Sequence, residues 1–387
     1  MDLSVFCSPI DVASLLPPKG DTIGSTIQAY SGKEFPDWSN AKAALIGVKE
    51  DRRSTHNKGS AQGPDIIRKF LYDLNCPDEL VDIVDLGNVK EGATYEDTTF
   101  ALRDICRTLI KSNVIPIIVG GTQDLTCAMY QGYEELEQTV NLVTVDQTLN
   151  FGGKQVDPSP DNFMNQIILH QPNYLFNYSN IGHQRYLVEK ELLDLMGKMY
   201  FDVYRLGWIA ESVERAEPVV RNADLVSIDI SVVRHSDAPG SSKSSPNGFY
   251  GEQLCQICRY VGMSDKMSAV GFFEYNPEFD RREITAQLIA QSIWCLVEAL
   301  GQRKKDYPVG DKSDYLKYIV DIPDSRDSIT FFKSPRTDRW WMDVPYPAGM
   351  KNKYHRHHMV PCTYEDYQNA TNEDIPDLWW KTYQKLT

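Results

Sequence analysis

This sequence of 387 residues lacks several features that mark particular classes of protein. Its eight cysteines are spread from Cys7 to Cys362 without the dense spacing of a disulfide framework, so we expect reduced thiols. No apolar run is long enough to span a bilayer, and the first residues have no basic region ahead of an apolar core. We therefore expect a cytoplasmic protein with no membrane insertion.

Positive charge is also scarce. Forty Lys and Arg stand against 54 Asp and Glu, a formal net charge of -14, which disfavours binding to nucleic-acid backbones or anionic membranes. Basic residues alternate with aromatic ones only near the C-terminus, and no nucleic-acid-binding motif accompanies them. The 42% hydrophobic and 24% charged content is that of an ordinary globular protein.

Short apolar runs alternate along the chain with segments of helical periodicity. Because such alternation is typical of a parallel sheet with right-handed helical crossovers, we expect a three-layer α/β/α fold with a mainly parallel sheet. The segments that predict strands are 43–48, 81–87, 114–119, 141–145, 226–233 and 270–274, and those that predict helices include 63–71, 98–112, 126–133, 252–261 and 284–300.

The most informative stretch is Leu225–Gly240. Its β-branched part predicts a buried parallel strand whose carboxyl end opens into a loop containing Pro239 and Gly240. Ligands of open α/β sheets bind at such strand ends. A carboxylate there, such as that of Asp229, needs a metal, a cation or hydrogen bonds to offset its desolvation.

This stretch resembles the ureohydrolase superfamily, which includes arginase, agmatinase and formimidoylglutamase. In that family the strand ends in Asp-x-Asp-x-x-Asp-Pro, and its first two acids bind a pair of manganese ions. Asp229 matches the first acid, Ser231 stands in place of the second, and Arg234-His235 stands where Asp-Pro would be. The resemblance covers about residues 42–300 and implies an arginase-like fold.

Two further motifs resemble the family and depart from it in the same way. The turn Gly120–Thr126 is similar to Gly-Gly-Asp-His-Ser, with Gln123 at the histidine position, and Asp146–Asn150 is similar to Asp-Ala-His-x-Asp. The six positions that match metal ligands of the family are Gln123, Asp146, Thr148, Asn150, Asp229 and Ser231. Only two are carboxylates, whereas two dications need several anionic ligands, so we expect no metal and no cofactor here, with manganese only in an atypical enzyme.

The segment Glu274–Pro277 matches the family's Glu-x-Asn-Pro, so Glu274 corresponds to the acid that recognises the guanidinium or amidine of a substrate. The same carboxylate could instead pair with Arg234, and we favour this internal ion pair because an unpaired buried acid is costly. We predict a pocket formed by Arg234, Glu274 and Asn276.

Three segments of the chain differ in composition: an N-terminal arm (1–41), the ureohydrolase-like core (42–300), and a linker followed by an aromatic and basic C-terminal extension (301–387). The extension is expected either to cover apolar surface of the core as a strap or to dock a partner, since Trp, Tyr and Arg are enriched in interface hot spots. Its candidate partner-binding residues are Trp340, Trp341, Trp379 and Trp380.

Three functions remain open at this point. The first is a catalytically inactive ureohydrolase-like protein that acts as a scaffold or as a binding or regulatory subunit. The second is an atypical formimidoylglutamase- or arginase-type amidine hydrolase with a different ion arrangement. The third is a metal-free sensor in which Asp229 and Glu274 bind a small cationic ligand. The family commonly forms homo-oligomers, so the resemblance also implies self-association or a protein partner.

Overall fold

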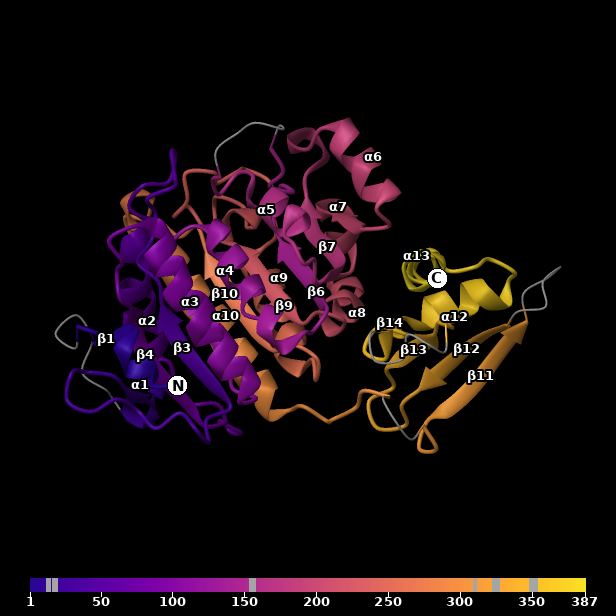
Figure 1. Ribbon diagram of the computed structural model, residues 1–387, viewed down its shortest axis with the longest axis horizontal. Coiled ribbons are helices and arrows are strands. Elements are labelled where there is room, and N and C mark those ends of the chain that lie inside the picture. Colours follow the sequence, from indigo (N-terminus) through magenta and orange to yellow (C-terminus); the bar gives the residue numbers. More distant parts are fainter. Residues whose placement is uncertain (12–14, 16–19, 153–157, 309–311, 322–327, 348–353) are drawn as a thin grey trace.

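The structure is a computed structural model that describes residues 1–11, 15, 20–152, 158–308, 312–321, 328–347 and 354–387. It consists of a large α/β core and a smaller C-terminal module, which lie side by side and are joined after helix α10 (Figure 1).

The core is built on one sheet in the order β1-β4-β3-β5-β10-β9-β6-β7-β8, with β2 beside β4. All pairs are parallel except β1 with β4. Its strands are β1 (Cys7–Ser8), β2 (Gln28–Ala29), β3 (Ala43–Gly47), β4 (Ile83–Val89), β5 (Ile115–Val119), β6 (Val140–Val145), β7 (Leu175–His183), β8 (Asp202–Arg205), β9 (Leu225–Asp229) and β10 (Ala269–Phe273).

Helices cover both faces of this sheet, which confirms the predicted three-layer α/β/α fold with a mainly parallel sheet (Figure 1). On one face α2 (Gly63–Asp73), α7 (Leu206–Glu211), α8 (Ala216–Arg221), α9 (Gly251–Met263) and α10 (Ile284–Gly301) enclose one hydrophobic cluster. On the other face α3 (Tyr95–Lys111), α4 (Thr126–Gln131), α5 (Phe163–Leu169) and α6 (Lys190–Lys198) enclose a second. The short α1 (Ile23–Thr26) belongs to the N-terminal arm, whose β1 and β2 extend the sheet.

Helix α10 is the one helix of the described residues that is long and apolar enough to cross a membrane. It packs against α9 and α2, and residues from Ala286 to Leu300 contribute to the first hydrophobic cluster. Its apolar composition therefore has a sufficient explanation in the protein core.

The predicted strand 226–233 is shorter in the structure. Strand β9 ends at Asp229, and Ile230–Val232 turn into a 3₁₀ segment because the Asp229 carboxylate accepts a hydrogen bond from the Ser231 amide at 2.7 Å. The β-branched residues that follow are buried in this turn rather than in a strand, since hydrophobicity alone does not distinguish the two.

The C-terminal residues form a folded module rather than a strap. Strands β11 (Leu316–Asp321), β12 (Ser328–Lys333), β13 (Trp340–Asp343) and β14 (Met359–Cys362) make an antiparallel sheet, and α12 (Tyr364–Thr371) and α13 (Asp377–Leu386) cover it. Trp340 and Trp379 belong to the hydrophobic cluster of the module itself. The aromatic residues thus provide the core that a small sheet needs for stability.

Candidate functional site

The predicted site residues meet at the carboxyl ends of β5, β6, β9 and β10, four strands that are neighbours in the sheet. Because parallel strands end at the same edge, loops that are far apart in the sequence converge there. All six positions that correspond to metal ligands of the family lie in these loops or strand ends. The structure therefore brings together the residues that the sequence motifs singled out.

The turn after β5 depends on its two glycines. Gly120 and Gly121 both have positive φ, and a Cβ atom on Gly121 would lie 2.3 Å from the Glu50 carbonyl oxygen. Only glycine fits such a left-handed position without a clash. The turn directs the Gln123 side chain into the site, where 1% of this residue is exposed.

Neutral side chains at the ligand positions form hydrogen bonds with one another and with Asp146. Asn150 donates from Nδ2 to Gln123 Oε1 at 2.7 Å and to Asp146 Oδ2 at 2.5 Å. Thr148 donates from its amide to Asp146 Oδ1 at 2.9 Å, and its hydroxyl donates to Asn150 Oδ1 at 2.8 Å. Both oxygens of the Asp146 carboxylate therefore accept hydrogen bonds within the protein.

The second retained carboxylate is less well satisfied. Asp229 accepts the Ser231 amide through Oδ1, but its buried Oδ2 has no hydrogen-bond partner among the described residues. The Ser231 hydroxyl accepts from Gln147 Nε2 at 3.0 Å. One oxygen of Asp229 is thus left for a ligand or for a proton.

A lysine that the motifs do not include contributes the positive charge of the site. Lys243 Nζ lies 2.6 Å from Asp161 Oδ1, and the carbonyl oxygen of Lys243 accepts from Gln147 Nε2 at 2.7 Å. Burial alone would lower the pKa of Lys243, but Glu274, Asp229 and Asp161 together raise it above its usual value. Lys243 therefore remains an ammonium ion that faces the acids.

The predicted ion pair between Arg234 and Glu274 is wrong. Arg234 lies 2.9 Å from Asp237 and stacks on the Tyr250 ring, outside the cluster of acids. Glu274 instead accepts from the Gln123 amide at 2.8 Å and from Asn57 Nδ2 at 2.8 Å.

The geometry of the loops explains why Glu274 does not pair with Arg234. Glu274 has φ +67°, an uncommon value for a residue other than glycine, and this conformation keeps its side chain on the Asn57 side of the site. Asn276, the third predicted pocket residue, donates to Asn57 Oδ1 at 3.2 Å and to the Lys58 carbonyl at 2.6 Å. It holds the same loop in place.

The acids of the site are buried and affect one another. Burial raises the pKa of Asp229 to about 7, and the nearby Asp146 adds to this shift while Lys243 opposes it. Burial likewise raises the pKa of Glu274 to about 7, with Lys243 again opposing the shift, and it raises the pKa of Asp146. The carboxyl groups of Asp229 and Glu274 therefore change protonation near neutral pH.

Sequence reasoning missed Asn57, Asp161 and Lys243. Lys243 lies in the Ser-rich loop directly after the Pro239-Gly240 turn, a place where a lone basic residue can reach the strand ends, and this was the one available indication. Nothing in the local sequence marks Asn57, which is 217 residues away from its partner Glu274.

The four tryptophans predicted to bind a partner lie in the C-terminal module, away from this site. Trp340, Trp341 and Trp379 are at most 7% exposed, whereas Trp380 is 50% exposed. Partner binding stays a prediction for all four. Only Trp380 presents a large exposed surface for it in this structure.

The residues at the ligand positions do not fit a pair of manganese ions. Two carboxylates are present, both oxygens of Asp146 accept from protein groups, and Lys243 adds a positive charge. Throughout the part of the chain that the structure describes, no group of three or more His, Cys, Asp or Glu is arranged to hold a metal ion. Hard dications prefer several anionic oxygen ligands, which this donor set does not supply.

Comparison with known proteins identifies relatives of the core. The sequence profile of the arginase family matches residues 41–298. Formimidoylglutamase of Staphylococcus haemolyticus is 25% identical over 260 residues, which are 64% of this chain and 83% of that protein. Formimidoylglutamase of Clostridium tetani is 25% identical over 272 residues, 65% of this chain and 80% of that protein.

Solved structures share the fold. The formimidoylglutamase of Bacillus subtilis superposes with a TM-score of 0.66 at 17% identity, covering 76% of this chain and 96% of that one. A formiminoglutamase of Trypanosoma cruzi, described with two Mn²⁺ ions, superposes with a TM-score of 0.63 at 16% identity, covering 70% of this chain and all of that one.

The manganese ions of that structure contradict the prediction that this protein uses no cofactor. The prediction rested on the presence of only two carboxylates among the six ligand positions, whereas a solved structure of the same fold contains manganese. Manganese therefore belongs in every activity measurement on this chain.

Proposed function

Because the chain belongs to the arginase family, we propose that it is a member whose core acts through binding, as a scaffold or regulatory subunit, rather than through amidine hydrolysis. One observation carries this proposal: the positions of the family's metal ligands are occupied by Gln123, Thr148 and Asn150, whose side chains bond to one another and to Asp146. Polar groups that satisfy one another form a stable buried network and leave few sites for a reacting water.

The charge of the site supports the same proposal. Lys243 faces the acids from the loop after β9 and pairs with Asp161. An ammonium ion at this place repels a cationic guanidinium or amidinium substrate. Glu274, the counterpart of the substrate-recognising acid, is fully buried and already accepts two hydrogen bonds from Asn57 and the Gln123 amide.

A second candidate function is that of a formimidoylglutamase-type hydrolase of linear amidines. The comparisons favour it, because the curated relatives are formimidoylglutamases. One structural observation also favours it: the buried Asp229 Oδ2 has no hydrogen-bond partner in the described part of the chain, and the charge of Asp146 acts on this carboxyl group. This candidate needs an ion arrangement different from that of the solved relatives.

A direct assay separates the two candidates. The full chain is incubated with N-formimidoyl-L-glutamate, arginine or agmatine in the presence of Mn²⁺, and formamide or urea release is measured. We expect no release above the rate without protein. Turnover that requires Mn²⁺ and disappears in Asp229→Asn would reject the binding role and support the hydrolase.

A matched variant tests whether the side chains at the ligand positions limit Mn²⁺ binding. Gln123→His, Thr148→His, Asn150→Asp and Ser231→Asp together restore the ligand types of the family, and Lys243→Ala removes the competing cation. We expect this variant to gain thermal stability from Mn²⁺ by mass action, whereas the unchanged chain gains less. An equal gain in both would show that these substitutions do not control Mn²⁺ binding, and it would favour the hydrolase over the binding role.

A further inference from the structure

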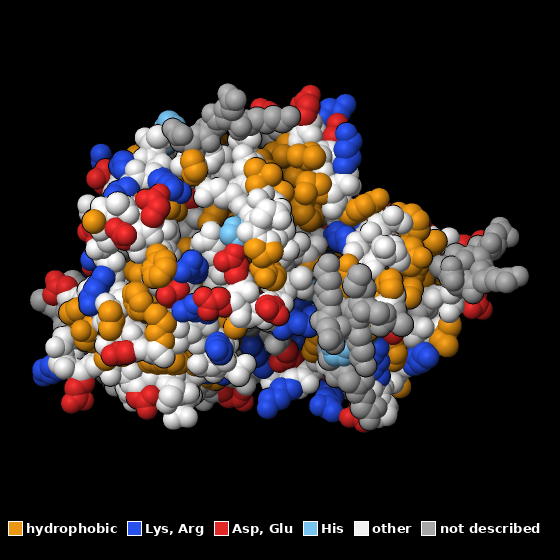
Figure 2. All heavy atoms as spheres, viewed as in Figure 1, with side chains coloured by type: hydrophobic (Ala, Val, Ile, Leu, Met, Phe, Trp, Pro, Cys, Tyr) orange, Lys and Arg blue, Asp and Glu red, His pale blue; other side chains and the backbone are white. Residues whose placement is uncertain are grey.

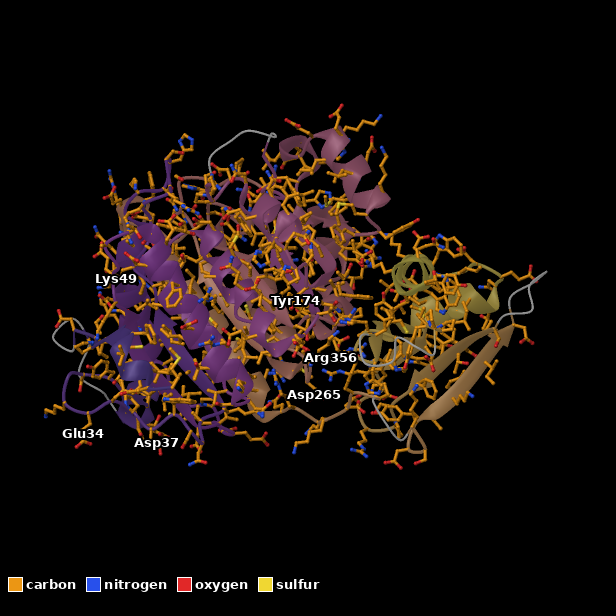
Figure 3. The ribbon with its side chains drawn as sticks, viewed as in Figure 1. Glu34, Asp37, Lys49, Tyr174, Asp265 and Arg356 are labelled. Atoms are coloured by element: carbon orange, nitrogen blue, oxygen red, sulfur yellow. The ribbon has the colours of Figure 1, made fainter. Side chains whose placement is uncertain are left out.

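A cavity of about 430 Å³ lies at the opposite end of the central sheet from the acid cluster. Its walls include Lys42, just before β3, Ser268, just before β10, and Ile115 at the start of β5. Tyr307 and Arg356 close it from the linker and the C-terminal module. Figure 3 shows Asp265 and Arg356, two of its lining residues, where the core meets the module.

The cavity has a surplus of positive charge. Four cationic side chains line it, those of Lys42, Lys266, Arg303 and Arg356, against the single carboxylate of Asp265. The chain as a whole has a formal net charge of -14, so a basic cavity is contrary to its composition. Figure 2 shows Lys and Arg side chains at the boundary between the core and the module.

Protein carboxylates neutralise these cations only in part. The buried Asp224, behind the cavity wall, pairs with Arg356 and lies 3.8 Å from Lys266. One carboxylate is thus shared by two cations. Among the described residues, no carboxylate lies within ion-pair distance of Lys42 or Arg303, although the charge of Asp265 acts on Arg303.

The burial of the Lys266 ammonium group at this place costs free energy. Lys266 is 8% exposed and its ammonium donates to Asn222 Oδ1 at 3.0 Å. Burial lowers the pKa of Lys266 to about 8, with Asp224 opposing the shift and Arg356 adding to it, and burial lowers the pKa of Arg303 to about 10 against the opposing charge of Asp265. Arg303 is held in position by hydrogen bonds to the carbonyls of Gly262 and Met267. Such fixed, partly unneutralised cations are expected where an anion binds.

The walls also provide apolar surface and recognition groups. Ile110, Val114 and Met267 face the same space as the charged side chains, and the volume lies in the range of small-molecule sites. An inorganic ion would leave much of this space unused. Arginine guanidinium groups bind carboxylate and phosphate oxygens in pairs, which a planar fork favours.

We propose that this cavity binds a small organic dianion, a phosphate monoester or a dicarboxylate, with its negative groups held by Lys42, Lys266, Arg303 and Arg356. Because Arg356 and Tyr307 lie outside the matched family core, the site is assembled only when the C-terminal module packs against the core. A bound dianion therefore stabilises the junction between the two parts.

Binding is tested on the full chain with three probes of similar size. Glycerol 3-phosphate and succinate carry two negative charges, and glycerol carries none. At constant ionic strength we expect the melting temperature to rise in a saturable way with glycerol 3-phosphate or succinate and to stay unchanged with glycerol. Comparison of the two shifts shows whether the site prefers a phosphate monoester or a dicarboxylate. No saturable shift with either anion would overturn the proposal.

Substitutions of the lining residues test whether the anion binds in this cavity. Lys42→Gln and Arg356→Gln are expected to weaken binding by about fivefold or more, since each removes one charge that faces the ligand. Lys198→Gln, an exposed lysine on α6, is the matched control and should bind like the unchanged chain. Equal affinity in all three variants would place the anion elsewhere and reject this cavity.

Lys266→Met distinguishes a ligand-binding role from a structural one. Removing a buried, partly unneutralised cation is expected to raise the melting temperature of the ligand-free protein and to abolish the shift caused by the anion. If Lys266 serves only the fold, the variant melts lower and retains the shift. If the variant is poorly stable, anion binding can be measured by titration calorimetry below its melting temperature. Binding that is retained in this variant would count against the proposal.

Discussion

The two ends of the central sheet carry opposite charge. At the carboxyl end, Asp146, Asp229 and Glu274 are buried with one cation, Lys243, while at the amino end four cations surround a cavity with Asp265 and the buried Asp224. At the carboxyl end Gln123, Asp146 and Asn150 hydrogen-bond to one another, whereas at the amino end the charged side chains line a cavity of about 430 Å³. The comparison indicates that the end where α/β sheets usually bind ligands is not the end best prepared for one here.

Removing Asp224 should have the largest effect, because this carboxylate is the buried counter-charge of the amino end. Asp224→Asn leaves Lys266 and Arg356 without it, and we expect a loss of about 3–5 kcal/mol in the free energy of unfolding. Urea denaturation measures the loss. Asp82→Asn, at the same end of the sheet but without an ion pair among the described residues, should cost far less; equal costs would mean that the charge of Asp224 has no special role.

Lys243→Met tests the carboxyl end in the same way. We expect a loss of about 2 kcal/mol at pH 7.5, a figure below that for a fully buried pair because the Lys243 side chain is 22% exposed. Lys58→Met, in a neighbouring loop and 57% exposed, is the control. A gain in stability would show that Lys243 is not needed to neutralise the acids.

The two ends should respond to pH with opposite sign. Asp229 and Glu274 have their pKa raised to about 7, so the native state binds more protons than the unfolded state between about pH 4 and 7, and the stability they contribute is lost as pH rises through 7. Lys266 has its pKa lowered to about 8 from 10.5, so stability should rise with pH between these values.

Denaturation midpoints from pH 5 to 10.5 measure both slopes. Asp229→Asn should flatten the acid part and Lys266→Met the alkaline part, each leaving the other unchanged, since the two ends share no ionisable partner. A variant that alters both slopes would contradict the independence of the two ends.

The smallest effect is expected for Arg234→Gln. Its ion pair with Asp237 is partly exposed, so we expect a change of at most about 1 kcal/mol in the free energy of unfolding. A loss of several kcal/mol would instead indicate that Arg234 forms the buried ion pair with Glu274 that this structure does not contain. Arg68→Gln provides the contrast, because Arg68 is 1% exposed and pairs with Asp85 at 2.7 Å.

The sequence by itself determined the layers of the core and the residues that meet at the carboxyl end. The alternation of apolar strands and amphipathic helices, the Gly120-Gly121 turn and the acids Asp146 and Asp229 are local features, and parallel strands bring their ends together whatever the loops contain. The sequence also indicated that Gln123 and Thr148 are poor metal ligands, because that follows from side-chain chemistry alone.

Tertiary structure alone decided which charges pair and where the open cavity lies. Strand β7 was not expected, because its polar residues hide the strand pattern, and the C-terminal sheet forms only when its tryptophans pack against residues far along the chain. Lys243 rather than Arg234 faces Glu274, and Arg356 reaches Asp224 across 132 residues. Electrostatic partners depend on distance in space, and a sequence records distance only along the chain.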